Sequence, residues 1–293
     1  MNFRSACVSV GVLLVLLAAA RRQAHAQGTY TQIDVPGALF TQCFGVNTKG
    51  DLVGLYEDAS GVDHGFLLSG GVYTDIDDLG WSLAVPSGID DEGQIVGYVS
   101  NYPAFSGFLY DVGAQAFTEL NYPGATITIA NGINNAGNIV GYYEVGEAVT
   151  NGFELVGSAY SEISRSSAVM TQAYGITSAG YIFGVVNWPK QEVPYNFAYF
   201  DAKFKNLNLP AGFTLTAVNP EGTVLAGIFM SRPGQYSGWV YRSKKYIFIS
   251  FPGSTETLAY GINRGDEIVG WFVDSSDNVH GFRWEPPSDA SPR

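Results

Sequence analysis

Apolar and polar positions alternate along this chain over short stretches that are separated by glycine, proline and asparagine. The stretches are rich in β-branched and aromatic residues, a composition typical of strands. Gln94–Val99 and Asn138–Tyr143 are examples. The pattern predicts an all-β protein, and it indicates no helix after residue 26.

One pattern, Gly-Ile-Asn-x-x-Gly-x-Ile-Val-Gly, recurs in six copies that begin 43, 44, 43, 42 and 44 residues apart. This period is expected for one propeller blade. Each period has room for four strands: one ending at Gly-Ile-Asn, one at Ile-Val-Gly, one beginning at His-Gly-Phe or a relative, and an aromatic-polar-polar-aliphatic strand. The repeats are predicted near residues 45–87, 88–131, 132–174, 175–216, 217–260 and 261–285.

The sixth repeat stops after its third strand, His280–Trp284, and its missing fourth strand matches a segment at the other end of the chain. Tyr30–Gly37 resembles the fourth-strand segment Tyr246–Gly253. A closed ring explains this split, because the N-terminal strand can pair into the last blade and leave only short edges. We therefore predict a single six-bladed β-propeller of four-stranded blades over residues 27–285, with residues 28–37 completing the last blade and a polar tail over residues 286–293. A β-solenoid is the alternative, but it does not explain the split repeat.

The constant positions of the repeat have structural explanations. The Asn or Asp of Gly-Ile-Asn stands at position i of a type I turn that has Gly at i+3, so it is predicted to cap the turn. The acidic turn Asp90-Asp91-Glu92 is expected to be exposed. Cys43 occupies a position that holds small apolar residues in other repeats, so it is predicted to be a buried structural cysteine and not a catalytic thiol.

The combination of these motifs resembles the HAF-repeat family of extracellular bacterial repeat proteins, which is named for a His-Ala-Phe triplet. His64-Gly65-Phe66 and His280-Gly281-Phe282 stand for that triplet here. The resemblance covers nearly the whole chain after residue 26, although four of the six repeats lack the histidine. It implies export and a bacterial source, and it implies no established enzymatic activity.

The first 26 residues are predicted to be a secretory signal peptide. Arg4 is followed by the apolar stretch Val8–Ala20 and by the cleavage motif Ala24-His25-Ala26. Uncleaved anchoring is the alternative, because Arg21 and Arg22 precede the cleavage motif. No second apolar stretch follows, so we expect a secreted protein, extracellular or periplasmic, without an integral membrane segment after cleavage.

Charge limits the class of partner. The chain carries 15 basic and 27 acidic side chains, and loss of the signal peptide would leave 12 basic ones and a net charge near −15. Such a chain repels phosphate backbones, so nucleic acid is not expected as a partner. We expect a monomer.

The search for catalytic residues identifies none. His64 and His280 share one repeat position and are predicted to form hydrogen bonds at the start of a strand. The acidic clusters contain Glu57, Asp58 and Asp63; Asp75, Asp77 and Asp78; and Asp90, Asp91 and Glu92. Solvated surface acids are the preferred interpretation, with a calcium site or a pair of catalytic carboxylates as alternatives. No cofactor or metal is predicted, apart from that calcium alternative.

Aromatic residues on the divergent connections indicate a binding surface, because they provide large contact area at a small cost in conformational entropy. The fourth-to-first and second-to-third connections should emerge on one face of the disc. The predicted ligand-binding residues on this face are Trp188, Tyr102, Phe105, Trp81 and Tyr195. The alternative is that these residues pack as a lid on the core.

Two functions follow from these observations. The first is an exported, non-catalytic binding or scaffold module that engages a polymer or protein through its long-loop face. The alternative is an extracellular hydrolase or lyase that uses carboxylates at the mouth of the propeller channel. Acidic side chains converging at that mouth would favour the enzyme.

Overall fold

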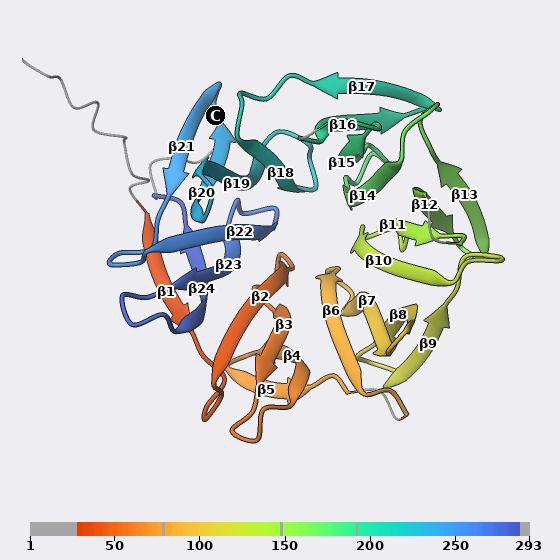
Figure 1. Ribbon diagram of the computed structural model, residues 1–293. Helices are drawn as coiled ribbons and strands as arrows, with labels where there is room; N and C mark the ends of the chain where they lie inside the picture. Colours follow the sequence, from red (N-terminus) through yellow and green to blue (C-terminus); the bar gives the residue numbers. More distant parts are fainter. Residues whose placement is uncertain (1–27, 78–79, 147–148, 192, 288–293) are drawn as a thin grey trace, which may run out of the picture.

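The computed structural model describes residues 28–77, 80–146, 149–191 and 193–287 (Figure 1). These residues form 24 strands and no helix, which confirms the all-β prediction. None of them belongs to a helix that could cross a membrane. The predicted signal peptide and residues 288–293 of the predicted tail lie outside the described residues.

The strands follow one another in antiparallel groups of four, which we call units. Unit 1 contains β2 (Phe40–Val46), β3 (Leu52–Glu57), β4 (Asp63–Ser69) and β5 (Val72–Asp75). Unit 2 contains β6 (Leu83–Ile89), β7 (Gln94–Asn101), β8 (Ala104–Asp111) and β9 (Ala116–Leu120). Unit 3 contains β10 (Ile127–Ile133), β11 (Ile139–Glu144), β12 (Thr150–Val156) and β13 (Ala159–Ile163).

The second half of the chain continues the same arrangement. Unit 4 contains β14 (Met170–Ile176), β15 (Ile182–Asn187), β16 (Tyr195–Phe200) and β17 (Lys203–Leu207). Unit 5 contains β18 (Phe213–Val218), β19 (Leu225–Arg232), β20 (Gln235–Arg242) and β21 (Lys245–Ile249). Unit 6 contains β22 (Glu256–Ile262), β23 (Ile268–Val273), β24 (Val279–Glu285) and the N-terminal strand β1 (Thr29–Ile33).

The pairing of β1 confirms that the N-terminal strand completes the last repeat. β1 runs antiparallel to β24, with Tyr30 opposite Trp284 and Ile33 opposite Gly281. Figure 1 shows the units around a central axis, with the first strand of each unit innermost. The architecture is propeller-type, as the repeat period predicts.

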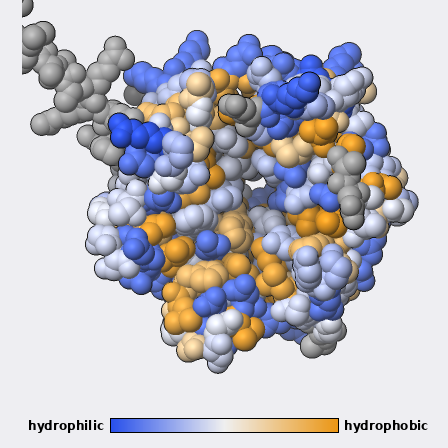
Figure 2. All heavy atoms as spheres, viewed as in Figure 1, coloured by the Kyte–Doolittle hydropathy of each residue, from blue (hydrophilic) through white to orange (hydrophobic). Residues whose placement is uncertain are grey.

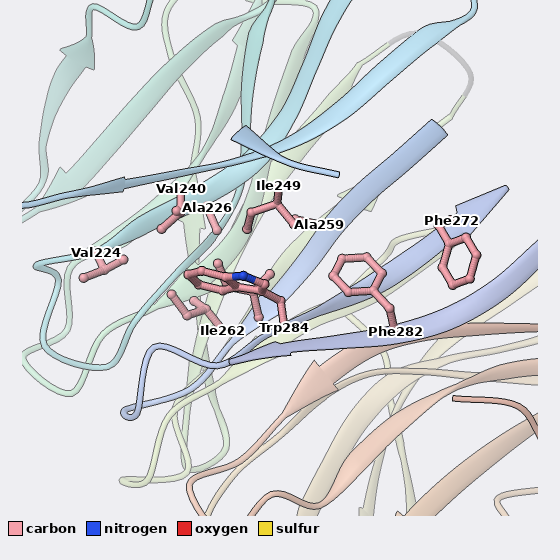
Figure 3. Close-up of a cluster of buried hydrophobic side chains, with 10 residues drawn as sticks. Val224, Ala226, Val240, Ile249, Ala259, Ile262, Phe272, Phe282 and Trp284 are labelled. Carbon is pink, nitrogen blue, oxygen red and sulfur yellow. The ribbon is translucent and has the colours of Figure 1, made fainter. Parts of the chain in front are cut away.

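Adjacent units are held together by apolar clusters. The cluster in Figure 3 joins Val240 and Ile249 of unit 5 to Phe282 and Trp284 of unit 6. A second cluster joins Ile33, Val35 and Val269 of unit 6 to Cys43, Leu52 and Phe66 of unit 1. Contacts therefore link the last unit to the first, as they link every other consecutive pair.

Cys43 has the structural role that its repeat position predicts. Its side chain is fully buried in the cluster between units 6 and 1. Burial raises the pKa of the thiol to about 12. The thiol therefore stays protonated and unreactive at neutral pH.

The glycine of Ile-Val-Gly allows a close approach of two strands, as predicted. A Cβ on Gly141 would lie 1.9 Å from the carbonyl oxygen of Ile129 on the neighbouring strand. In unit 1 a Cβ on Gly54 would also lie 2.8 Å from the Phe66 ring. Any side chain at this position would push apart two paired strands and the aromatic residue that covers them.

The Asn of Gly-Ile-Asn caps its own turn and also joins neighbouring units. Asn47 Oδ1 accepts a hydrogen bond from the Asp51 N–H at 2.9 Å, and Asn47 Nδ2 donates to the Asp90 carbonyl of unit 2 at 3.0 Å. Asn263 of unit 6 donates in the same way to the Asn47 carbonyl at 2.9 Å. The capping role is confirmed, and the link between units is a second role that the turn pattern does not reveal.

Asp90 is buried, which corrects the expectation of an exposed acidic turn. Only 4% of the residue is exposed, because its side chain folds back to accept hydrogen bonds from the N–H groups of Glu92 and Gln94. Burial raises the pKa of its carboxyl group. A carboxylate also has no proton to donate to the next unit, unlike the Asn at this position elsewhere.

Asp90→Asn is therefore expected to raise the unfolding free energy by about 1 kcal/mol at pH 7. The new amide can keep both turn hydrogen bonds and donate to unit 3. An acid with a raised folded pKa destabilises the protein as the pH rises through that pKa, so the gain should be smaller at pH 4 than at pH 7. Urea unfolding at both pH values measures it. Asn47→Asp is the converse variant and should lose about 1 kcal/mol; a stabilised Asn47→Asp would contradict the account.

Candidate ligand cavity

Each inner strand contains a β-bulge at the residue before Gly-Ile-Asn. In β2 the pairing with β3 shifts between Cys43 and Gly45, so Phe44 is the extra residue. The five other inner strands shift at the equivalent place. The extra residues, which we call the bulge ring, are Phe44, Ser87, Asn131, Tyr174, Thr216 and Tyr260.

The bulge ring lines a central cavity of about 410 Å³. The other lining residues are Val85, Tyr98, Thr214 and Ile228. Figure 2 shows the molecule hollowed near the centre of the ring. Bulges often re-aim a side chain beside a functional site, and here all six aim at the same space.

Two smaller spaces adjoin the cavity along the axis. The next space along the axis measures about 100 Å³ and the following one about 80 Å³. Both are bordered by the aliphatic residue of each Gly-Ile-Asn, which together form an aliphatic ring. Its members are Val46, Ile89, Ile133, Ile176, Val218 and Ile262.

The large cavity lies toward the face that carries the divergent connections. Inner strands run from this loop face to the face of the Asx turns, and the lining residues Val85 and Thr214 come early in β6 and β18. The smallest space is instead bordered by turn residues such as Asn47 and Asn134. Of these three spaces, the largest thus lies toward the loops and the smallest toward the Asx turns.

The cavity is lined by neutral side chains. Seven of its ten lining residues carry a hydroxyl or amide group, and three are apolar. Burial raises the pKa of the Tyr98, Tyr174 and Tyr260 hydroxyls, so these phenols stay protonated at neutral pH. Protonated phenols both donate and accept hydrogen bonds.

Some lining groups are already held in place by neighbouring units. Asn131 Nδ2 donates to the Ala173 carbonyl at 2.8 Å, and Thr216 Oγ1 donates to the Ala259 carbonyl at 2.7 Å. The Tyr174 hydroxyl is held within its own strand, β14, where it donates to Gln172 Oε1 at 3.0 Å. The Asn131 carbonyl oxygen and the hydroxyl oxygens remain able to accept from a ligand.

The five sequence-predicted ligand residues lie outside this cavity. Trp188 and Tyr195 are brought together, with ring centroids 6.0 Å apart. Trp81 packs on the apolar cluster between units 1 and 2, whereas Trp188 packs on the cluster between units 3 and 4, and Tyr102 is 87% exposed. Phe105 does not line the cavity itself. Its ring lies beside that of the lining residue Tyr98, with ring centroids 6.1 Å apart.

Trp188 combines exposure with packing. Its ring packs on the core of unit 4, its Nε1 donates to the Ser166 carbonyl at 3.2 Å, and the Arg165 guanidinium lies 5.3 Å from its ring centroid. These contacts favour the predicted alternative that Trp188 covers the core. The exposed part of its ring remains available to a ligand.

Two of the second-to-third connections, which the sequence predicts to be divergent loops of the binding face, are tight hairpins, which is a correction. β7 ends at Asn101 and β8 begins at Ala104, so Phe105 lies on a strand. β19 and β20 are likewise joined by Pro233-Gly234 alone, a pair that suits a tight turn. The pairing of these strands continues further than their sequence pattern indicates.

His64 and His280 form matching clusters on units 1 and 6. His64 Nδ1 lies 3.0 Å from Asp77 and its Nε2 lies 3.5 Å from Asp58. His280 Nδ1 lies 2.9 Å from Asp34 and its Nε2 lies 3.6 Å from Asp274. The predicted hydrogen-bonding role at the start of the third strand is confirmed.

These clusters are not arranged for metal binding, because the two carboxylates of each lie on opposite ring nitrogens. Among residues 28–77, 80–146, 149–191 and 193–287, no group of three or more His, Cys, Asp or Glu side chains could hold a metal ion.

Replacing His64 by glutamine is expected to lower the unfolding free energy by about 0.5 kcal/mol at pH 6 and by less at pH 8.5. Burial alone lowers the pKa of His64, but the Asp77 and Asp58 carboxylates outweigh it and raise the pKa. The stabilisation is present below the unfolded pKa of about 6.5 and is lost as the pH rises through the folded value. Denaturant unfolding at both pH values tests this. Ser237→Ala, at the equivalent position of unit 5, should show no such difference; an equal loss for His64→Gln at both pH values would refute the ion pairing.

No protein-family profile matches the sequence, and a comparison with curated proteins finds no match. Solved structures with a similar fold include TolB from Acinetobacter baumannii, at 10% identity and a TM-score of 0.57 over 80% of this chain and 63% of TolB. The chain thus spans less than two thirds of the TolB length.

Two further similar structures are covered almost completely. A variant of Aleuria aurantia lectin in complex with Fucα1-6GlcNAc has 12% identity and a TM-score of 0.53, over 87% of this chain and 98% of the lectin. A gluconolactonase from Xanthomonas campestris has 14% identity and a TM-score of 0.52, over 90% of this chain and 97% of that enzyme. At such identities the similarity concerns the fold alone.

The bulge ring is the part of the site that sequence reasoning missed. The constant positions of the repeat point to a scaffold, whereas the residue before Gly-Ile-Asn changes in nearly every copy. It is Phe, Ser, Asn, Tyr, Thr and Tyr in turn, between an apolar position and one that is glycine in every repeat except the fifth, which has Ala217. Variation at one position inside an otherwise regular motif was the available signal.

Proposed function

We propose that this protein is an exported, non-catalytic binding module that holds a neutral ligand in the cavity of the bulge ring. The observation that carries the proposal is the ring itself: six bulges aim six mostly different neutral side chains into one cavity. A cavity of about 410 Å³ with aromatic walls and a few polar groups has the size and composition of a small-ligand site.

The proposal includes the finer architecture of the predicted fold. We infer that the units are the blades of one closed six-bladed propeller. The pairing of β1 with β24 and the apolar cluster between units 6 and 1 support this inference. The resemblance to HAF-repeat proteins and the signal-peptide pattern of residues 1–26 support export.

The alternative, a hydrolase or lyase, receives no support from the cavity. Its mechanism would need carboxylates at the mouth of the channel, whereas the lining residues among the described parts of the chain are neutral. Asp90, the most buried acid of the predicted clusters, instead serves its own turn.

Three of the sequence-predicted ligand residues are assigned an accessory role. Tyr102, Trp188 and Tyr195 lie on connections of the loop face, toward which the cavity lies. A polymer or protein bound at the cavity could contact them. Substitutions of these residues therefore serve as the comparison for substitutions of cavity residues in binding experiments.

A thermal-shift screen with a library of neutral small molecules, including saccharides, tests the proposal, because a ligand that prefers the folded state raises the melting temperature. Hits are then titrated calorimetrically against Ser87→Trp, which fills the cavity, and against Trp188→Ala. We expect binding to weaken at least tenfold in Ser87→Trp and to persist in Trp188→Ala. Absence of any hit, or a hit unaffected by Ser87→Trp in a folded variant, would contradict the cavity as the site.

A further inference from the structure

We infer that the ligand of the cavity is a neutral sugar ring, taken either as a free saccharide or as the terminal unit of a glycan chain. This inference rests on the proposed function, since it assigns a chemical class to the ligand of the same cavity. Two observations carry it: the chemistry of the lining and the size of the cavity relative to the spaces beside it.

The lining combines apolar ring faces with uncharged hydrogen-bonding groups. Phe44 and Tyr260 form an aromatic corner between units 1 and 6, with centroids 5.6 Å apart. Ser87 and Asn131, on units 2 and 3, continue the ring with a hydroxyl and an amide. A sugar ring is complementary to both parts, because its C–H face packs on aromatic carbon while its hydroxyls pair with neutral donors and acceptors.

Other ligand classes fit this lining less well. A charged ligand would lose water without meeting an opposite charge, which is costly. A purely aromatic ligand would bury the Asn131 carbonyl oxygen and the lining hydroxyl oxygens, which remain able to accept, without giving them a donor, at a cost for each unpaired group. A neutral polyhydroxy ring avoids both costs.

The sizes of the spaces along the axis indicate which part of the channel a ligand would fill. The space next to the cavity, which the bulge ring and the aliphatic ring border together, measures about 100 Å³ against about 410 Å³ for the cavity. The aliphatic ring offers no hydrogen-bonding side chain to a hydroxylated ligand. The cavity, not the smaller spaces beside it, is therefore the part of the channel that a free sugar or a chain end entering from the loop face would fill.

Calorimetric titration with glucose, galactose, mannose, fucose and N-acetylglucosamine, and with their linear oligomers, tests the class of ligand. Glucuronate and galacturonate serve as charged counterparts, and indole as a neutral aromatic probe. We expect at least one neutral sugar to bind, with at least tenfold weaker binding of its uronate and no binding of indole. Phe44→Ala and Asn131→Leu should each weaken the sugar at least tenfold, and Trp188→Ala should not.

The second arm separates free sugars from chain ends. An oligomer of the best sugar is compared with the same oligomer carrying a bulky fluorophore at one end, then at the other. Recognition of a chain end predicts that one of the two modifications abolishes binding and the other does not. Recognition of a free sugar predicts that the monosaccharide binds at least as well as any oligomer.

Equal binding of both end-modified oligomers would overturn the inference, because it indicates recognition of internal units. Binding of indole or of the uronates with no binding of neutral sugars would also overturn it, while leaving the cavity as a ligand site. Failure of every small molecule to bind at the cavity would instead remove the proposed function itself.

Discussion

A chain that begins at Ala38 is expected to be at least about 5 kcal/mol less stable than one that begins at Gly28, and to unfold or aggregate under conditions where the longer chain is monomeric. The missing segment contains β1, whose five residues pair with β24. It also contains Ile33 and Val35, which are buried between units 6 and 1. Each such side chain contributes about 1.5–3 kcal/mol when buried, and the loss exposes the edge of β24 for aggregation.

Equilibrium unfolding in urea and size-exclusion chromatography measure this effect. A synthetic peptide of residues 28–37, added in excess, should restore part of the lost melting temperature, because it can pair with β24 in trans. A chain ending at residue 287 is the control for truncation as such, since β24 ends at Glu285. An unchanged melting temperature and a monomeric state after loss of residues 28–37 would disprove the closure by β1.

Gly141→Ala is expected to lower the unfolding free energy by about 3 kcal/mol. The new methyl group would lie 1.9 Å from the Ile129 carbonyl oxygen and 3.0 Å from Ala130 Cα, and both atoms belong to the backbone. Relief requires separation of β10 from β11 where the bulge of Asn131 begins. The variant should therefore also weaken ligand binding at the bulge ring.

Gly175→Ala is the matched control, because its Cβ would meet only Val218 Cγ1 at 3.7 Å, an ordinary contact. Unit 5 has Ala217 at the equivalent position, so this substitution occurs naturally within the ring. We expect a change of about 0.5 kcal/mol or less in Gly175→Ala. Denaturant unfolding of both variants tests the contrast, and equal stabilities would show that the close approach at Gly141 is unimportant.

Much of the architecture could be predicted because residues that recur at the same repeat positions determine it. The repeat period, the Asx turns and the split sixth repeat lead to the antiparallel four-strand units and to the pairing of β1 with β24. Turn capping by Asn47 and burial of Cys43 are local consequences of residue type and register. Such features depend on interactions within one repeat or between equivalent ones.

The candidate site could not be predicted in the same way, since it depends on where strands approach the axis. A bulge is a property of the pairing between two strands, so nothing in β2 alone shows that Phe44 is the extra residue. The aromatic residues on connections, such as Tyr102, are predicted ligand residues because aromatic side chains offer a large contact area. They nevertheless lie outside the cavity. The hydrogen bond from Asn47 to the Asp90 carbonyl could not be predicted from the turn sequence either, because Asp90 is 43 residues away.

The most direct test of the central claim is a crystal structure of the protein soaked with the best neutral ligand from the screen. The account predicts ligand density inside the bulge ring, against Phe44 and Tyr260 and within hydrogen-bonding distance of Asn131 or Ser87. Density over Trp188 and Tyr195 with none between the six bulges would contradict it.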